Sequence, residues 1–84
     1  MNNVLMRKIT ITADYQPLAA ERTVATVTIS CPPANAAVVY FQGDDGSDVP
    51  WLPGDWHTLV GVNLADIQVK GTVGDRVTLV GGSW

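Results

Sequence analysis

The sequence is dominated by β-branched residues, and this feature most constrains the fold. Twelve Val, four Ile and eight Thr make 24 of the 84 residues, and such side chains favour strands because two heavy atoms on Cβ restrict χ1 in a helix. Glu occurs once and Lys twice, so the residues that favour exposed helix faces are nearly missing. Apolar residues recur with a period of two and not with the period of a helix. The sequence therefore predicts an all-β protein.

Alternating segments and turn signals divide the chain into about seven short strands. The predicted strands cover residues 7–13, 25–30, 37–42, 48–52, 56–60, 67–70 and 76–80. Turn signals recur every 8–12 residues or so, a spacing typical of a small antiparallel β-sandwich or a partly open barrel. Residues 62–66 are compatible with either a 3₁₀ turn or a continued strand.

Proline and glycine positions predict one edge strand and two turns. Pro50 cannot donate to a β-ladder, so the strand over 48–52 is expected at a sheet edge. Pro53 and Gly54 suit the two central positions of a type II turn. The glycines of 71–75 favour a second hairpin, which would place Val77 and Leu79 beside Ile67 and Val69.

Length and charge limit the architecture and the partners. A chain of 84 residues forms one domain, 1–84, and we expect residues 1–6 to be a flexible N-terminal arm. A core this small is thin against conformational entropy, which favours oligomerisation. The net charge of −3 argues against nucleic acid as a partner. No apolar run is long enough to span a membrane and no signal-peptide pattern opens the chain, so we expect folding in a cytoplasm.

The polar residues do not form a recognisable catalytic or metal-binding pattern. The chain has one His, His57, and one Cys, Cys31, and no strained nucleophile motif accompanies either. The acidic segment over residues 44–48, with Asp55, lacks the ligand spacing of a calcium loop, and a solvated hairpin tip is the better interpretation. We therefore expect no enzymatic activity, no metal and no cofactor.

Three tryptophans in so short a chain are the best candidates for contact residues, because a thin core cannot enclose them all. Trp51, Trp56 and Trp84, together with Tyr40 and Pro50, are the candidate interface residues. They could pack against neighbouring subunits. Alternatively, Trp51, Trp56 and the acidic hairpin could form a carbohydrate-binding or adhesion surface. A third interpretation places Trp56 in the core and Trp51 over an open end of the sandwich.

The turn-and-strand pattern of residues 39–50, 53–56 and 62–84 resembles that of small accessory virion proteins of tailed bacteriophages and prophages. This resemblance covers roughly the last forty-five residues and includes no catalytic motif. It implies a non-enzymatic β-sandwich that acts as an accessory capsid (head decoration) or tail-associated component. It also implies a homo-oligomer that contacts other virion proteins and is assembled in the host cytoplasm. No functional residue is transferred by it.

Overall fold

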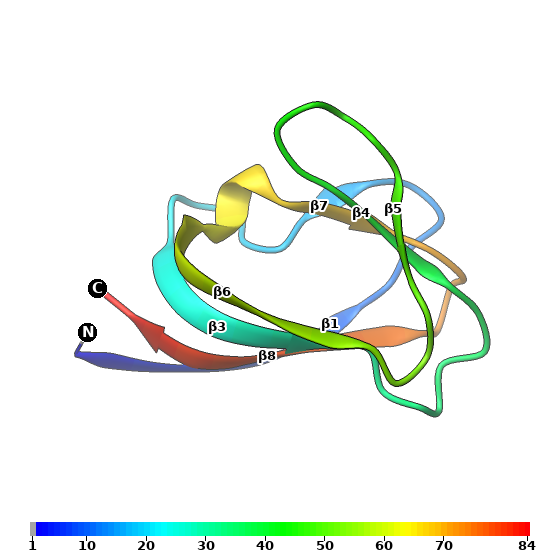
Figure 1. The fold of residues 1–84 in the computed structure, drawn as a ribbon, viewed down its shortest axis with the longest axis horizontal. Coiled ribbons are helices and arrows are strands. Elements are labelled where there is room, and N and C mark those ends of the chain that lie inside the picture. Colours follow the sequence, from blue (N-terminus) through cyan, green and yellow to red (C-terminus); the bar gives the residue numbers. More distant parts are fainter. Residues whose placement is uncertain (1) are drawn as a thin grey trace.

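Eight strands form two antiparallel sheets of four strands each in the structure, a computed structural model that describes residues 2–84. Sheet A has the order β1 (Asn3–Thr10), β8 (Arg76–Ser83), β3 (Val24–Ser30) and β6 (Trp56–Asn63). Sheet B has the order β2 (Gln16–Pro17), β7 (Gln68–Lys70), β4 (Val39–Gln42) and β5 (Val49–Trp51). The sheets lie as two layers and do not close into a barrel (Figure 1). The predicted all-β sandwich is confirmed.

Alternation along each strand sends one set of side chains into the space between the sheets. In β3, Ala25, Val27 and Ile29 are buried, whereas the intervening threonines lie on the other face of the strand. Sheet B contributes Val39, Phe41 and Val69 from the opposite side. The fully enclosed side chains include Ile11, Leu18, Val27, Ile29, Val39, Leu64, Val69, Val77 and Leu79. The core thus lies between the layers, and the outer face of each sheet remains free.

Several local predictions are confirmed. Strand β5, which contains Pro50, lies at the edge of sheet B. At the predicted type II turn, the Asp55 amide donates to the Leu52 carbonyl at 2.9 Å, and Gly54 has the positive φ of 92° that this turn requires. In the ambiguous segment 62–66, Val62 and Asn63 continue β6, and a 3₁₀ turn, η1 (Leu64–Asp66), follows, with the side chain of Asn63 capping its first turn.

The predicted hairpin over 71–75 is wrong. Strand β7 pairs with β2 and β4 in sheet B, whereas β8 pairs with β1 and β3 in sheet A. The segment therefore crosses from one sheet to the other. Asp75, which is only 6% exposed, holds this crossing in place because its carboxylate accepts hydrogen bonds from the amides of Ala36 and Ala37 at 2.9 and 3.1 Å.

The prediction of a flexible N-terminal arm over residues 1–6 is also wrong for residues 3–6. Residues 3–6 belong to β1, which pairs with β8 along its full length, and Leu5 is buried. Burial of Leu5 supplies the apolar contact that fixes the start of the strand. Met1, the first residue of that expected arm, lies outside the described residues.

Candidate interaction surface

The outer face of sheet A exposes five large apolar side chains. Val4 is 83% exposed, Met6 69%, Val60 75%, Trp56 63% and Val80 50%. These residues come from three strands, β1, β6 and β8. Their outward neighbours on β3 and β8 are mostly threonines. This set of exposed residues is called the sheet A face below.

Cross-strand register brings these residues into rows. Met6 stands opposite Val80, Val80 opposite Thr28, and Thr28 opposite Thr58. The two threonine hydroxyls are hydrogen-bonded to each other at 2.9 Å, so their polarity is satisfied within the row. In the next row, Val4 stands opposite Gly82.

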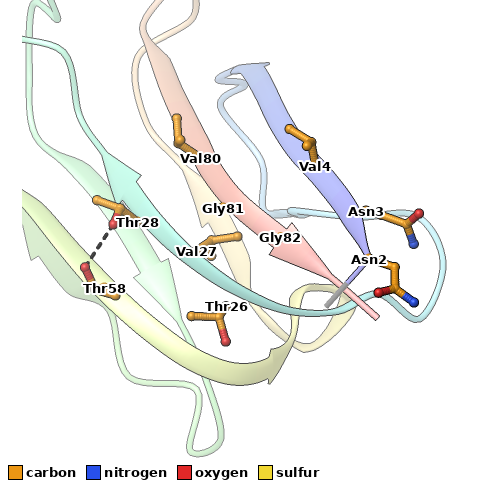
Figure 2. A pocket seen from close by; sticks show the side chains of 10 residues that line it. All are labelled: Asn2, Asn3, Val4, Thr26, Val27, Thr28, Thr58, Val80, Gly81 and Gly82. Atoms are coloured by element: carbon orange, nitrogen blue, oxygen red, sulfur yellow. Dashed lines mark hydrogen bonds between the residues drawn. The ribbon is translucent and has the colours of Figure 1, made fainter.

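A shallow open depression of about 480 Å³ lies over this part of the face (Figure 2). Its floor passes over Gly81 and Gly82, and Val4, Val80 and Thr26 stand around it (Figure 2). Glycine has no side chain to fill the row between β1 and β3, which explains the hollow. The ten residues that line it carry no ionisable side chain. The depression can bury apolar surface, and the polar side chains that it offers are amides and hydroxyls.

The charges on sheet A are of one sign. Its four strands, all within the described part of the chain, contain no Asp or Glu. Lys8 and Arg76 occupy outward positions near one end of the face, beside Thr78 and Thr10 respectively. The acidic residues therefore lie in loops, in η1 and elsewhere outside this sheet.

The outer face of sheet B shows the opposite character. Gln42 stands opposite Gln68, and Tyr40 stands opposite Lys70. The Tyr15 hydroxyl donates to Asp48, Gln42 donates to the same carboxylate at 3.1 Å, and the Lys70 ammonium lies 4.7 Å from the centre of the Tyr15 ring. Sheet B thus presents a connected polar network, as is usual for a face turned to water.

The predicted contact residues are not brought together on one surface. Trp56 lies at the start of β6 on the sheet A face, so its placement in the core is wrong. Trp84 is 62% exposed, and its amide donates to the Val24 carbonyl at 3.2 Å. Tyr40 and Pro50 are exposed opposite each other in sheet B.

Trp51 is part of the core. Its side chain is 8% exposed and stacks on Phe41 with ring centres 3.9 Å apart, while His57 approaches its edge at 4.5 Å. Both contacts are favourable for aromatic rings and fix the indole in place. Trp51 therefore offers no free ring face to a sugar or to a neighbouring subunit.

The acidic hairpin between β4 and β5 uses its carboxylates to form the turn. Asp45 accepts from the amide of Ser47 at 2.9 Å, which lowers the pKa of Asp45. Hydrogen bonds from Tyr15 and Gln42 lower the pKa of Asp48. Within residues 2–84, no group of three potential metal-ligating side chains is found.

Cys31 is a buried residue of the core. It is 1% exposed, and burial, assisted by Asp55 and Asp75, raises the pKa of its thiol to about 11. A thiol with this pKa is almost entirely protonated at neutral pH and is a poor nucleophile.

Sequence reasoning missed most of the sheet A face. Val4 and Met6 lie within residues 1–6, where a flexible arm is expected, and residues 4–6 are apolar on both strand faces and do not alternate. The available signal was the pair Val4 and Met6 at a spacing of two, which continues the outward side of the strand that carries Lys8.

The chain is therefore a β-sandwich with one apolar and one polar outer face. Comparisons with protein-family models, curated proteins and solved structures find no match to it. In the described residues, no helix has the length and apolar character needed to cross a bilayer.

Proposed function

We propose that this protein is a non-enzymatic structural subunit that works by assembly through the sheet A face. Five large apolar side chains exposed on one sheet support this proposal. Exposed apolar surface of this kind favours an interaction site, because burying it against a partner releases water and stabilises the complex.

The contrast between the two sheets supports the same function. Sheet B shows that this chain can cover an outer face with glutamine, lysine and a hydrogen-bonded carboxylate. Sheet A instead presents valine, methionine, tryptophan and paired threonines. Interfaces are enriched in aromatic residues and methionine, and depleted in aspartate and glutamate, at their centres.

The biological setting in the proposal is the virion of a tailed phage, as a head-decoration or tail-associated protein. The resemblance of residues 39–50, 53–56 and 62–84 to such proteins is its support. Proteomic analysis of phage particles released by the cells that carry this gene tests the setting. Detection of the chain in purified particles is expected, and its consistent absence from them would refute the setting.

Analytical ultracentrifugation with a matched pair of variants tests the assembly surface. Val80→Lys places a charge at the centre of the sheet A face, whereas Val73→Lys places the same charge at a valine that is 73% exposed in the loop before β8. We expect the first change to raise the dissociation constant about tenfold or more and the second to leave it unchanged. A wild-type protein that stays monomeric at about 2 mM, well above the range of specific complexes, would refute assembly with itself.

A further inference from the structure

Three of the four sheet edges are shaped in ways that oppose pairing with another strand. Strand β2 has two residues and contains Pro17, and β5 has three and contains Pro50. Strand β6 has a bulge between the positions that pair with Ala25 and Val27, where Gly61 adopts a φ of 62°. Short length, proline and bulges are the usual means by which edge strands avoid association.

Strand β1 has none of these features. It runs for eight residues without proline and keeps one unbroken register with β8, from Asn3 opposite Ser83 to Thr10 opposite Arg76. Its outer edge is thus a regular row of backbone donors and acceptors. A row of this kind is a template for another strand.

The hydrogen bonds at its ends define which part of this edge is open. The Ile11 amide donates to the Asp75 carbonyl at 2.8 Å, so by alternation the odd-numbered residues of β1 bond to β8 and the even-numbered residues point outward. The Gln16 side chain donates to the outward Thr10 carbonyl at 2.7 Å and occupies that end. The Asn2 amide is turned to β8, where it donates to Ser83 at 3.2 Å. Val4, Met6 and Lys8 remain open.

We propose that β1 pairs with β1 of a second copy, antiparallel and around a two-fold axis at Met6, to extend sheet A into one eight-stranded sheet. This inference rests on the proposed assembly function and names a second copy of this chain as a partner, held at the edge of sheet A so that the two sheet A faces lie side by side. A regular edge needs a regular edge opposite it, and among the described strands only β1 provides one. Met6 lies midway between Val4 and Lys8, so a two-fold axis at Met6 pairs the outward backbone amides and carbonyls of all three residues with those of the second copy.

Backbone complementarity favours this register over its neighbours. Met6 faces the partner's Met6, and Val4 faces the partner's Lys8 on both sides of the axis, which gives about six hydrogen bonds because each such pair exchanges two. Moving the two-fold axis toward Thr10 would require the Thr10 carbonyl to accept from the partner strand, but that carbonyl already accepts from the Gln16 side chain. Moving the axis toward the N-terminus would require the Asn2 amide to donate to the partner strand, but that amide already donates to Ser83 of β8.

The side chains agree with the same arrangement. Met6 lies opposite Val80 in the sheet, so the pairing joins both residues to their symmetry mates in one apolar stripe across the sheet A face. Val4, 83% exposed, comes under the aliphatic stem of the partner's Lys8. The two Lys8 residues stand four positions apart along the paired strands, roughly 13 Å, where salt screens their repulsion.

Amide hydrogen exchange by NMR at about 50 µM and about 2 mM tests the pairing. A strand pair of this length buries less than a standard interface, so we expect weak association, with a dissociation constant of about 0.1 mM. At that value the amides of Val4, Met6 and Lys8 exchange about fourfold more slowly in the concentrated sample. The amides of Leu5 and Arg7, already bonded to β8, change little with concentration. If the protein associates but the amides of Val4, Met6 and Lys8 exchange at the same rate at both concentrations, the edge pairing is refuted and the assembly proposal is not.

Cross-linking supplies a second test. Met6→Cys places two thiols directly opposite each other at the axis, with Cβ atoms about 4.5–5.5 Å apart, close enough for a disulfide after a small shift. Val60→Cys is the control, since Val60 is 75% exposed on the other edge strand, and Cys31 is buried and does not compete. Covalent dimer should form several-fold faster from Met6→Cys. Equal rates overturn the edge pairing and leave the assembly proposal standing, whereas a monomeric wild-type protein at about 2 mM refutes both.

Discussion

Replacement of Gly81 by alanine should be the most damaging single-methyl change in sheet A. A Cβ at this position would lie 2.0 Å from the carbonyl oxygen of Thr26 and 2.8 Å from the Cα of Val27. Both atoms belong to the backbone of β3, so no side-chain rotation can relieve the clash. Strands β8 and β3 would have to separate at the middle of a sheet in which six residue pairs hold them together.

The cost can be estimated from overpacking in general. Forcing extra carbon atoms into a packed site costs about 1–3 kcal/mol, and a backbone clash belongs at the upper end. A domain of this size has a total stability of roughly 4–13 kcal/mol. We therefore expect Gly81→Ala to lower the free energy of unfolding by about 3 kcal/mol and the melting temperature by roughly 12–24 °C.

Thermal and urea unfolding followed by circular dichroism measures this effect. Gly43→Ala is the matched control, because a Cβ there meets nothing within 4 Å. We expect its melting temperature to change by no more than about 2–4 °C, as for a surface substitution. A melting temperature for Gly81→Ala within the range of the control would refute the close approach of β3 and β8.

Two further predictions concern polar groups that hold loops in place. Asp75→Ala leaves the two amides of segment 36–37 without their acceptor, so urea unfolding should show a loss of about 2–4 kcal/mol, whereas a loss below about 1 kcal/mol would contradict this role. Partial burial and the hydrogen bond to Asp48 raise the pKa of Tyr15 to about 12. The folded state therefore keeps this phenol protonated above the pH at which the unfolded chain ionises, and the stabilisation present below pH 10 declines between pH 10 and about 12. Tyr15→Phe should lose less stability than the wild type over that range and should raise the pKa of Asp48 in an NMR titration; unchanged behaviour in both measurements would count against the hydrogen bond.

Local chemistry accounts for the parts of the fold that the sequence predicts well. Strict alternation identifies β3 because buried and exposed side chains must take turns along a strand. Pro50 marks an edge because it cannot donate to a neighbour, and Asn63 marks the start of η1 because its side chain can cap a turn. Each of these signals acts within a few residues.

The pairing of strands depends on contacts distant in sequence, and local patterns do not encode it. The glycines of 71–75 suit a hairpin and an inter-sheet crossing equally well. What decides between them is the bonding of Asp75 to residues 36–37, nearly forty positions away. The same limit applies to the candidate surface, because Val4, Met6 and Val80 become neighbours only when β1 and β8 pair.

Stability of the isolated fold does not explain the apolar character of the sheet A face. Val80 and Thr28 point away from the core, so a lysine or glutamate at either position would increase solubility at little cost to packing. The chain uses such residues on sheet B, where Lys70 and Gln42 occupy equivalent outward positions. The proposed assembly through the sheet A face accounts for these side chains, because a partner that lies against the face would bury them and make apolar residues favourable there.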